Sequence, residues 1–193
     1  MLAVLAAPSA AAAEAGDILV QAGHEGRPAS CAVHHVKACN IGTGAHGAHE
    51  REWTALVADE ATRVLRARGY AVLRRPADYD GGDTVRAAVF LHFDGSATPC
   101  GSGSSVGFPD ATPRAFVEAW ERRYRAWFPF RFVGENFTSN EHTYYGFRRV
   151  DAPQKMLIEF GEMTCPAQFA WMAPRLGEMG DRLAAFLIEQ VPR

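Results

Sequence analysis

The sequence has few lysines and no concentration of charge of either sign. Only Lys37 and Lys155 occur among its 193 residues, so arginine supplies the other 18 of the 20 basic groups. The 22 acidic residues bring the formal net charge to -2, and like charges form no long run. A protein that binds nucleic acid needs a concentrated basic face to neutralise phosphates. We therefore expect no nucleic acid among its partners.

Long apolar runs are also missing. No run reaches the roughly 18 residues that a membrane helix needs, so we expect no integral membrane segment. At the N-terminus, residues 1–13 are apolar or small and rich in alanine. Such a stretch is typical of the apolar part and cleavage site of a secretory signal peptide, although an alanine-rich tail without a targeting role is the alternative. We interpret residues 1–13 as a signal-peptide remnant and expect a secreted or periplasmic protein.

Several motifs of other enzyme classes are absent. No Gly-x-Ser-x-Gly motif is present, which argues against a serine nucleophile. The Gly/Ser-rich residues 101–107 include no lysine and do not lie between a strand and a helix, which excludes a phosphate-binding loop. No Cys-x-x-Cys pair supports a cysteine-rich zinc site.

The four cysteines, in an exported chain, instead suggest disulfides. Four cysteines allow three pairings. We favour a bridge between Cys31 and Cys39, because it would close a short loop.

The hydrophobic pattern predicts a single α/β domain over residues 14–193. Hydrophobic residues make up 48% of the sequence and charged residues 22%, as in globular proteins. Short apolar runs predict strands at 17–22, 70–73, 85–93 and 156–160. Helical spacing predicts helices over 50–68, from 113 onward and from 176 to 191. Because the strands are apolar on both faces and alternate with helices, we expect a central, mostly parallel or mixed twisted sheet flanked by helices.

The remaining segments have weaker patterns. Thr112 is expected to cap a helix whose buried stripe holds Phe116, Trp120, Tyr124 and Trp127. Residues 128–150 are aromatic and irregular, and 144–147 fit a short strand. Residues 23–49 are expected to form one long loop, which in a compact domain is usually functional or disordered.

Three candidate metal ligands stand out by their positions. His24 follows the first predicted strand, His92 lies at the end of the third, and Glu50 begins the first helix. Ligands of open α/β sheets bind beyond the carboxyl ends of the strands, so these side chains could meet there. Two histidines and one carboxylate leave an open position for water on a catalytic zinc ion. The sequence therefore predicts one Zn²⁺ at this edge.

A zinc hydrolase also needs a group that takes the proton of the water. Glu159 ends the fourth predicted strand and would reach the same edge, where burial would raise its pKa toward the useful range. Glu162, three residues further on, is the alternative base.

Four motifs in this order resemble those of the zinc-dependent N-acetylmuramoyl-L-alanine amidases of the amidase_3 type. They are Gly23-His24-Glu25-Gly26, the helix-opening Glu50, Leu91-His92-Phe93-Asp94 and Leu157-Ile158-Glu159-Phe160-Gly161. The family has Gly-His-Gly-Gly, a Glu that opens the first helix, Ser-x-His-x-Asn-Ala and Val-Glu-x-Gly-Phe. The residues after His24, His92 and Gly161 differ from the family pattern, and these differences concern the substrate more than the metal.

The resemblance implies that His24, Glu50 and His92 bind zinc and that Glu159 is catalytic. It also implies a central sheet with flanking helices, of the phosphorylase/hydrolase-like type. The implied reaction is hydrolysis of the amide bond between N-acetylmuramic acid and L-alanine, and the implied partners are peptidoglycan or muropeptides. We expect the protein to act as a monomer. The alignment further places Cys100 and Cys165 near the same site, so we expect a disulfide between them.

Other readings of single residues stay open. His34-His35, His46 and His49 could bind metal from the loop, Glu52 could replace Glu50, and His142 could touch substrate. After the helix that begins near 113, the aromatic residues Phe128, Phe130 and Phe132 could form a sugar-stacking wall instead of being part of the core. Two other functions also remain. A zinc carboxypeptidase or other amidohydrolase would use Arg86 or Arg148 to hold a carboxylate, whereas an inactive cell-wall-binding module would bind without turnover.

Overall fold

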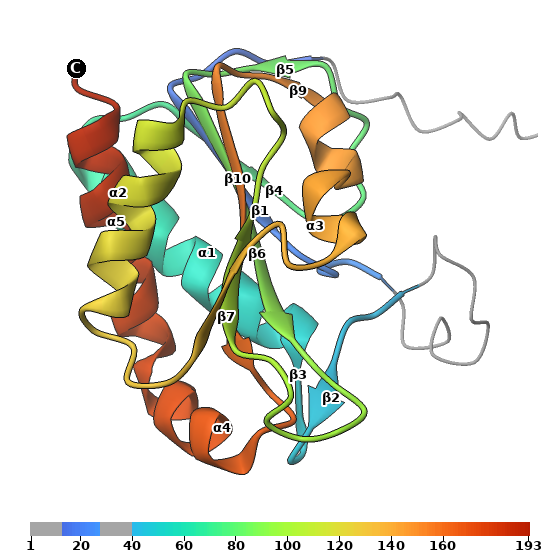
Figure 1. Cartoon of the computed structure of the whole chain (residues 1–193). Helices are drawn as coiled ribbons and strands as arrows, with labels where there is room; N and C mark the ends of the chain where they lie inside the picture. Colours follow the sequence, from blue (N-terminus) through green and yellow to red (C-terminus); the bar gives the residue numbers. More distant parts are fainter. Residues whose placement is uncertain (1–12, 28–39) are drawn as a thin grey trace, which may run out of the picture.

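A mixed six-stranded sheet forms the centre of the computed structural model, which describes residues 13–27 and 40–193. The strand order is β4-β1-β6-β10-β7-β8 (Figure 1). The bounds are β1 (Ile18–Ala22), β4 (Val72–Arg75), β6 (Ala87–Asp94), β7 (Ser104–Gly107), β8 (Phe132–Glu135) and β10 (Gln154–Glu162). The first four strands of that order run parallel, and β7 is antiparallel to β10. The predicted α/β class, with a mostly parallel mixed sheet, is confirmed.

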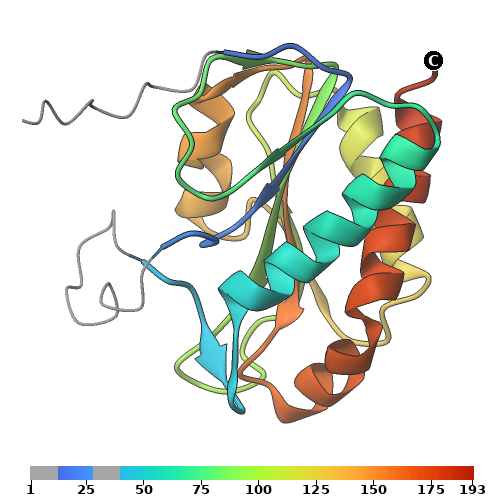
Figure 2. The same cartoon turned by 180° about the vertical axis from the view of Figure 1, so that it is seen from behind.

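Long helices cover one face of the sheet. They are α1 (Glu50–Ala67), α2 (Arg114–Arg125) and α5 (Leu176–Gln190), with the shorter α4 (Pro166–Met172) at one end. Seen from behind, α1 and α5 lie side by side across this face (Figure 2). Among the described residues, the helices on the opposite face are the short α3 (Ser139–His142) and η3 (Tyr145–Arg148). The thin cover on this second face leaves room for a cavity.

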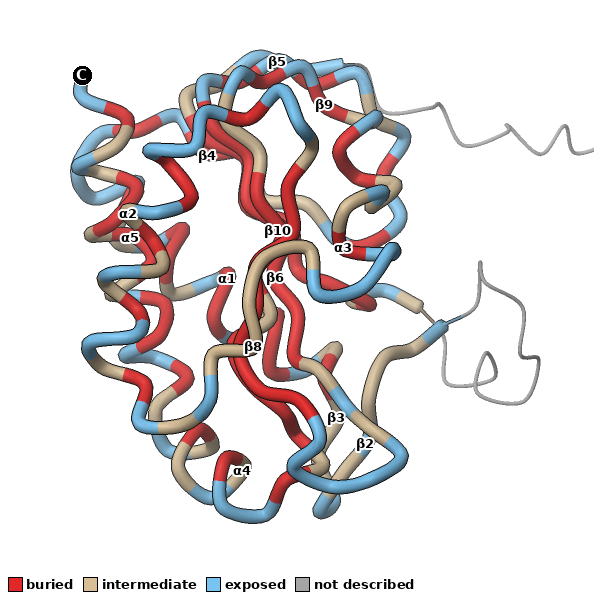
Figure 3. Tube along the Cα trace, viewed as in Figure 1, coloured by how far each residue is buried: buried red, intermediate tan, exposed pale blue. Residues whose placement is uncertain are grey.

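The strands are buried on both faces because their residues alternate between two apolar clusters. In β6, Val89, Leu91 and Phe93 belong to the larger cluster under the long helices. Ala88 and Phe90 of the same strand belong to the smaller cluster on the α3 side. Figure 3 shows the central strands as an almost continuous buried region. Two-sided burial explains why the sequence reads as continuous apolar runs there.

The predicted helices are present, with one difference at a cap. The first helix ends at Ala67, two residues before Gly69, which has a φ of +83°. Thr112 does not cap α2, which begins at Arg114 after Pro113. The Thr112 hydroxyl donates instead to the Lys155 carbonyl oxygen at 3.0 Å, because it faces β10.

The weakly patterned segments differ more from the predictions. The loop after β1 contains a small hairpin of β2 (Gly44–Ala45) and β3 (Ala48–His49). Residues 144–147 are not a strand, since hydrogen bonds from Phe147 N to Tyr144 O and from Arg149 N to Gly146 O close turns there. The sequence also gave no signal for β7, β8 or α4. Further short elements are β5 (Asp83–Thr84), β9 (Val150–Asp151) and η4 (Ala173–Arg175).

One predicted disulfide is confirmed. Cys100 and Cys165 are bonded, with their Cα atoms 4.5 Å apart. Cys31 and Cys39 lie outside the described residues, as does the predicted signal-peptide remnant apart from Ala13. None of the helices in the described part of the chain has the length and apolarity to cross a membrane.

Candidate metal centre

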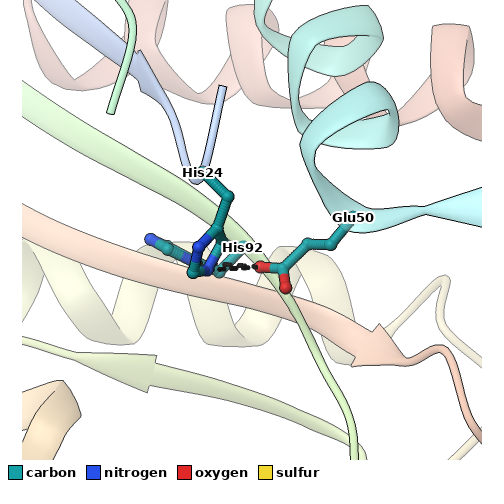
Figure 4. A group of neighbouring side chains, drawn as sticks. All are labelled: His24, Glu50 and His92. Carbon is teal, nitrogen blue, oxygen red and sulfur yellow. Dashed lines mark hydrogen bonds and ion pairs between the residues drawn. The ribbon is translucent and has the colours of Figure 1, made fainter. Parts of the chain in front are cut away.

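His24, Glu50 and His92 lie together at the carboxyl edge of the sheet. They come from the turn after β1, the first residue of α1 and the end of β6 (Figure 4). Glu50 Oε1 lies 3.0 Å from His92 Nδ1 and 3.4 Å from His24 Nε2. One ligand atom from each residue falls within 4.8 Å of the others, and all three residues are mostly buried. The cluster could hold a metal ion.

Glycines allow this close approach. A Cβ atom at position 23 would lie 2.4 Å from His92 Cε1, so only glycine fits between the two histidine-bearing segments. His24 itself has a φ of +59°, a left-handed conformation that aims its ring back toward β6. Gly42 has a φ of +81°, and a Cβ there would lie 2.5 Å from Glu50 Oε2. Steric crowding against His92 thus explains why glycine precedes His24 in the motif.

Hydrogen bonds on the far side of each ring orient the two histidines. His24 Nδ1 lies 2.8 Å from the Asn40 carbonyl oxygen, to which it donates. His92 Nε2 lies 3.1 Å from the Tyr144 hydroxyl oxygen, and that hydroxyl donates to Gln21 Oε1 at 2.8 Å. The tautomers that follow from these partners leave a lone pair on His24 Nε2 and on His92 Nδ1. Both lone pairs face Glu50, as metal ligation requires.

Glu50 is held as a carboxylate. Burial by itself would raise the pKa of Glu50, but His24, His92 and the backbone N–H of Thr43 together hold it below its usual value. Thr43 N donates to Oε2 at 2.7 Å and Phe93 N to Oε1 at 3.1 Å. Burial also lowers the pKa of His24, against the opposing charge of Glu50. Two imidazole nitrogens and a carboxylate form a donor set that occurs in catalytic zinc sites.

Glu159 lies beside this cluster on β10. It is in register with His92, so both side chains project from the same face of the sheet. Its Oε2 atom is buried and has no hydrogen-bond partner among the described residues. Burial, followed by the charges of Glu50, Asp94 and Glu141, raises the pKa of Glu159 well above its usual value. A carboxyl group in this state is suited to accepting and releasing a proton.

The cluster and Glu159 line one cavity of about 910 Å³ on the α3 side of the sheet. Asp94, Glu141 and Glu159 make part of its wall acidic, whereas other parts carry arginines. Glu141 was not among the residues predicted from the sequence, and its Oε1 accepts from the Ser105 hydroxyl at 3.1 Å. The Thr-x-x-Glu pattern from Thr138 was a usable signal, because it is typical of a helix N-terminus.

The structure places the alternative base, Glu162, elsewhere. Its carboxylate does not line the cavity and accepts hydrogen bonds from the hydroxyl and backbone groups of a neighbouring loop. The donors are Ser96 Oγ, Cys100 N, Ser102 N, Ser102 Oγ and Thr164 Oγ1. Burial would raise the pKa of Glu162, but these donors outweigh it and hold the pKa below the usual value. Glu162 therefore braces the loop after β6.

The other alternative ligands lie apart from the cluster. Glu52 is exposed on α1, and the His46 ring packs against Phe169 with centroids 4.7 Å apart. His142 lies 3.7 Å from Asp110, and His49 is not in the cluster. His34 and His35 lie outside the described residues.

The aromatic stripe of α2 is core. Trp120 and Tyr124 are fully or almost fully buried, and Phe128 is 4% exposed. Phe130 and Phe132 pack against the same cluster and do not line the cavity. The sugar-stacking alternative therefore has no support from these residues.

Comparisons with known proteins give a clear result for the fold. No protein-family model and no curated protein matches the sequence. Three similar solved structures are Cwp6 from Clostridium difficile, N-acetylmuramoyl-L-alanine amidase AmiC2 of Nostoc punctiforme, and the catalytic domain of CwlV, an N-acetylmuramoyl-L-alanine amidase from Bacillus (Paenibacillus) polymyxa var. colistinus.

Their TM-scores are 0.65, 0.64 and 0.63, at sequence identities of 16%, 14% and 13%. The matches cover 94%, 96% and 93% of this chain, and 30%, 100% and 98% of the other chains. This chain thus spans less than a third of Cwp6 but nearly all of the two amidase domains. The chain has the fold of N-acetylmuramoyl-L-alanine amidases, as the sequence motifs implied.

Proposed function

We propose that the chain is a zinc-dependent amidase that hydrolyses the bond between N-acetylmuramic acid and L-alanine in bacterial peptidoglycan. One observation carries the proposal: His24, Glu50, His92 and Glu159 line a single cavity, and the buried Oε2 atom of Glu159 has no hydrogen-bond partner among the described residues. The similarity in fold to solved N-acetylmuramoyl-L-alanine amidases supports the choice of substrate. The reaction is the hydrolysis of a linear amide.

The roles of the residues follow from their positions. His24 Nε2, His92 Nδ1 and a Glu50 carboxylate oxygen would hold the zinc ion. Zinc bound there supplies a Lewis acid for the amide carbonyl and brings the pKa of water near 7. Glu159 accepts a proton from the attacking water and delivers it to the leaving nitrogen of alanine. Asn40 and Tyr144 keep the two imidazoles in the orientation and tautomer for ligation.

The bounds of the domain, its localisation and its oligomeric state belong to the same proposal. Residues 14–193 form the catalytic domain and residues 1–13 are a signal-peptide remnant of a secreted or periplasmic protein that acts as a monomer. The disulfide between Cys100 and Cys165 supports export, since such bonds persist in oxidising compartments.

Product analysis tests this function. Purified protein is incubated with peptidoglycan, with zinc or with a chelator, and new amino-terminal alanine and new reducing sugar ends are measured. We expect only new amino-terminal alanine, and only with zinc. His24→Ala should abolish it, whereas His142→Ala, which changes a histidine outside the cavity, should not. Reducing ends instead of amino termini would contradict an amidase.

A zinc carboxypeptidase is the second candidate, because Arg148 lines the cavity and could hold a terminal carboxylate. Arg86, the other arginine considered for this role, is remote from the cavity and donates to the Pro192 carbonyl oxygen at 2.5 Å. A panel of free peptides against muropeptides separates the two enzymes. An inactive cell-wall-binding module would bind peptidoglycan equally well with Glu159→Gln and never cleave it.

A further inference from the structure

Three arginines line the cavity that holds the candidate metal centre: Arg27, Arg148 and Arg149. Arg27 is neutralised, because its guanidinium makes two hydrogen bonds to Asp78, at 2.9 and 3.1 Å. Another of its nitrogens donates to the Asn40 carbonyl oxygen at 2.6 Å. Arg27 therefore belongs to the support of His24 and has little capacity left for a ligand.

Arg148 and Arg149 are different. Neither takes part in an ion pair with any of the described carboxylates, although both line the cavity. Asp78 is influenced by the charge of Arg149, but both of its oxygens are bonded to Arg27. Both arginines donate hydrogen bonds to carbonyl oxygens, Arg148 to Thr143 O at 3.5 Å and Arg149 to Tyr79 O. Two positive charges thus line one cavity without a direct ion pair to a carboxylate of the described residues.

The Arg149 guanidinium is also held in place. Besides its bond to Tyr79, it lies over the Tyr145 ring at 5.2 Å from the centroid. The Tyr145 hydroxyl oxygen is 3.5 Å from Arg27 Nη2, and Arg27 Nη1 is 3.3 Å from His24 Nδ1. This chain of contacts runs from the candidate metal ligand His24 to Arg149. A guanidinium ordered in this way loses little entropy when it binds an anion.

The cavity therefore has two electrostatic ends. Asp94 and Glu159 lie on the strands β6 and β10 and Glu141 bonds to Ser105 of β7, whereas Arg148 and Arg149 lie on and after η3. A carboxylate on the substrate would be repelled by the acidic part and attracted by the arginines. Guanidinium groups bind carboxylates through paired, charge-assisted hydrogen bonds.

We infer that Arg148 and Arg149 form a subsite for a carboxylate in the peptide part of the substrate, beyond the alanine at the cleaved bond. The inference rests on the proposed amidase function and refines its substrate class to stems with a free carboxylate near the scissile amide. The subsite sets the direction of binding, with the carboxylate at the arginine end and the amide at the acidic end.

Two soluble glycan substrates test the subsite. Their stems are L-alanyl-D-isoglutamyl and L-alanyl-D-isoglutaminyl groups with the γ-carboxyl blocked as an amide, so they differ only in an α-carboxylate or an α-carboxamide. We expect wild-type kcat/KM to favour the carboxylate by about tenfold, the effect of one partly exposed charge-assisted contact. The preference should lie in KM and weaken with added salt.

The variants show whether the arginines cause the preference. Arg148→Gln with Arg149→Gln should bring the ratio of the two kcat/KM values to about one. The ratio of the two kcat/KM values within one variant does not depend on the fraction of protein that is folded. Arg148→Gln alone, at an exposed position, should lower this ratio only partly. Arg86→Gln is the control and should keep the preference.

The outcomes separate the inference from the proposed function. Equal cleavage of both substrates by the wild type, or an unchanged ratio in the double variant, overturns the subsite and leaves the amidase function standing. No cleavage of either substrate by zinc-loaded wild type overturns the amidase function and the subsite with it.

Discussion

Tyr144→Phe removes a single hydroxyl group that supports the candidate metal centre from outside. That oxygen lies 3.1 Å from His92 Nε2 and 2.8 Å from Gln21 Oε1, and Gln21 is fully buried. Without the hydroxyl, His92 can rotate or change tautomer, so that Nδ1 no longer presents its lone pair. We expect the variant to bind zinc about tenfold more weakly, as for other groups that support metal ligands.

The same change has a separate cost in folding. The buried Gln21 Oε1 loses its hydrogen-bond donor, so the free energy of unfolding of the metal-free protein should fall by about 1 to 3 kcal/mol. Tyr145→Phe is the matched control. It removes the neighbouring hydroxyl, which donates to Ala77 O at 2.6 Å. That hydroxyl makes no contact with either histidine of the cluster.

Zinc affinity is measured by competition with a coloured chelator, and stability by urea unfolding in excess chelator. The account requires weaker zinc binding in Tyr144→Phe than in Tyr145→Phe. Equal zinc affinity in wild type and both variants would refute the claim that the Tyr144 hydroxyl orients His92.

Two further predictions concern a glycine and a buried carboxylate. Gly42→Ala should weaken zinc binding, because the new methyl group would press on Glu50; Gly47→Ala, at a similar φ of +80° with no atom within 4 Å, should leave zinc affinity unchanged. Equal effects of the two would contradict the steric argument. Glu162→Gln should lower the unfolding free energy by about 3 kcal/mol at neutral pH, measured by urea unfolding. Because folding lowers the pKa of Glu162, this contribution exists above the unfolded pKa of about 4.3 and disappears as pH falls through the folded pKa. A difference between wild type and variant that persists at lower pH would show that charge is not its source.

Strong periodicity made most of the fold predictable. Val89 to Phe93 form a run that is apolar on both faces, and such a run has few alternatives to a central strand. In contrast, β7 has the sequence Ser-Ser-Val-Gly and is buried because β10, β8 and α3 surround it. Small polar residues carry no strand signal of their own, so only the tertiary environment defines this strand.

The clustering of His24, Glu50 and His92 was predictable because position along the chain coincides with position at the sheet edge. His24 follows β1 and His92 lies near the carboxyl end of the adjacent parallel strand β6, which brings them together in any fold of this type. The supporting residues could not be found in this way. Tyr144 lies in a turn 52 residues from His92, and no local pattern connects the two. The contact exists because η3 folds back over the sheet.

Zinc content together with amidase activity, in wild type and Glu159→Gln, tests the central claim most directly. Glutamine keeps the size of the side chain but cannot take up a proton. The account predicts one bound zinc in both proteins and release of dye from labelled peptidoglycan by the wild type alone. Absence of zinc from both proteins, or full activity in Glu159→Gln, would contradict it.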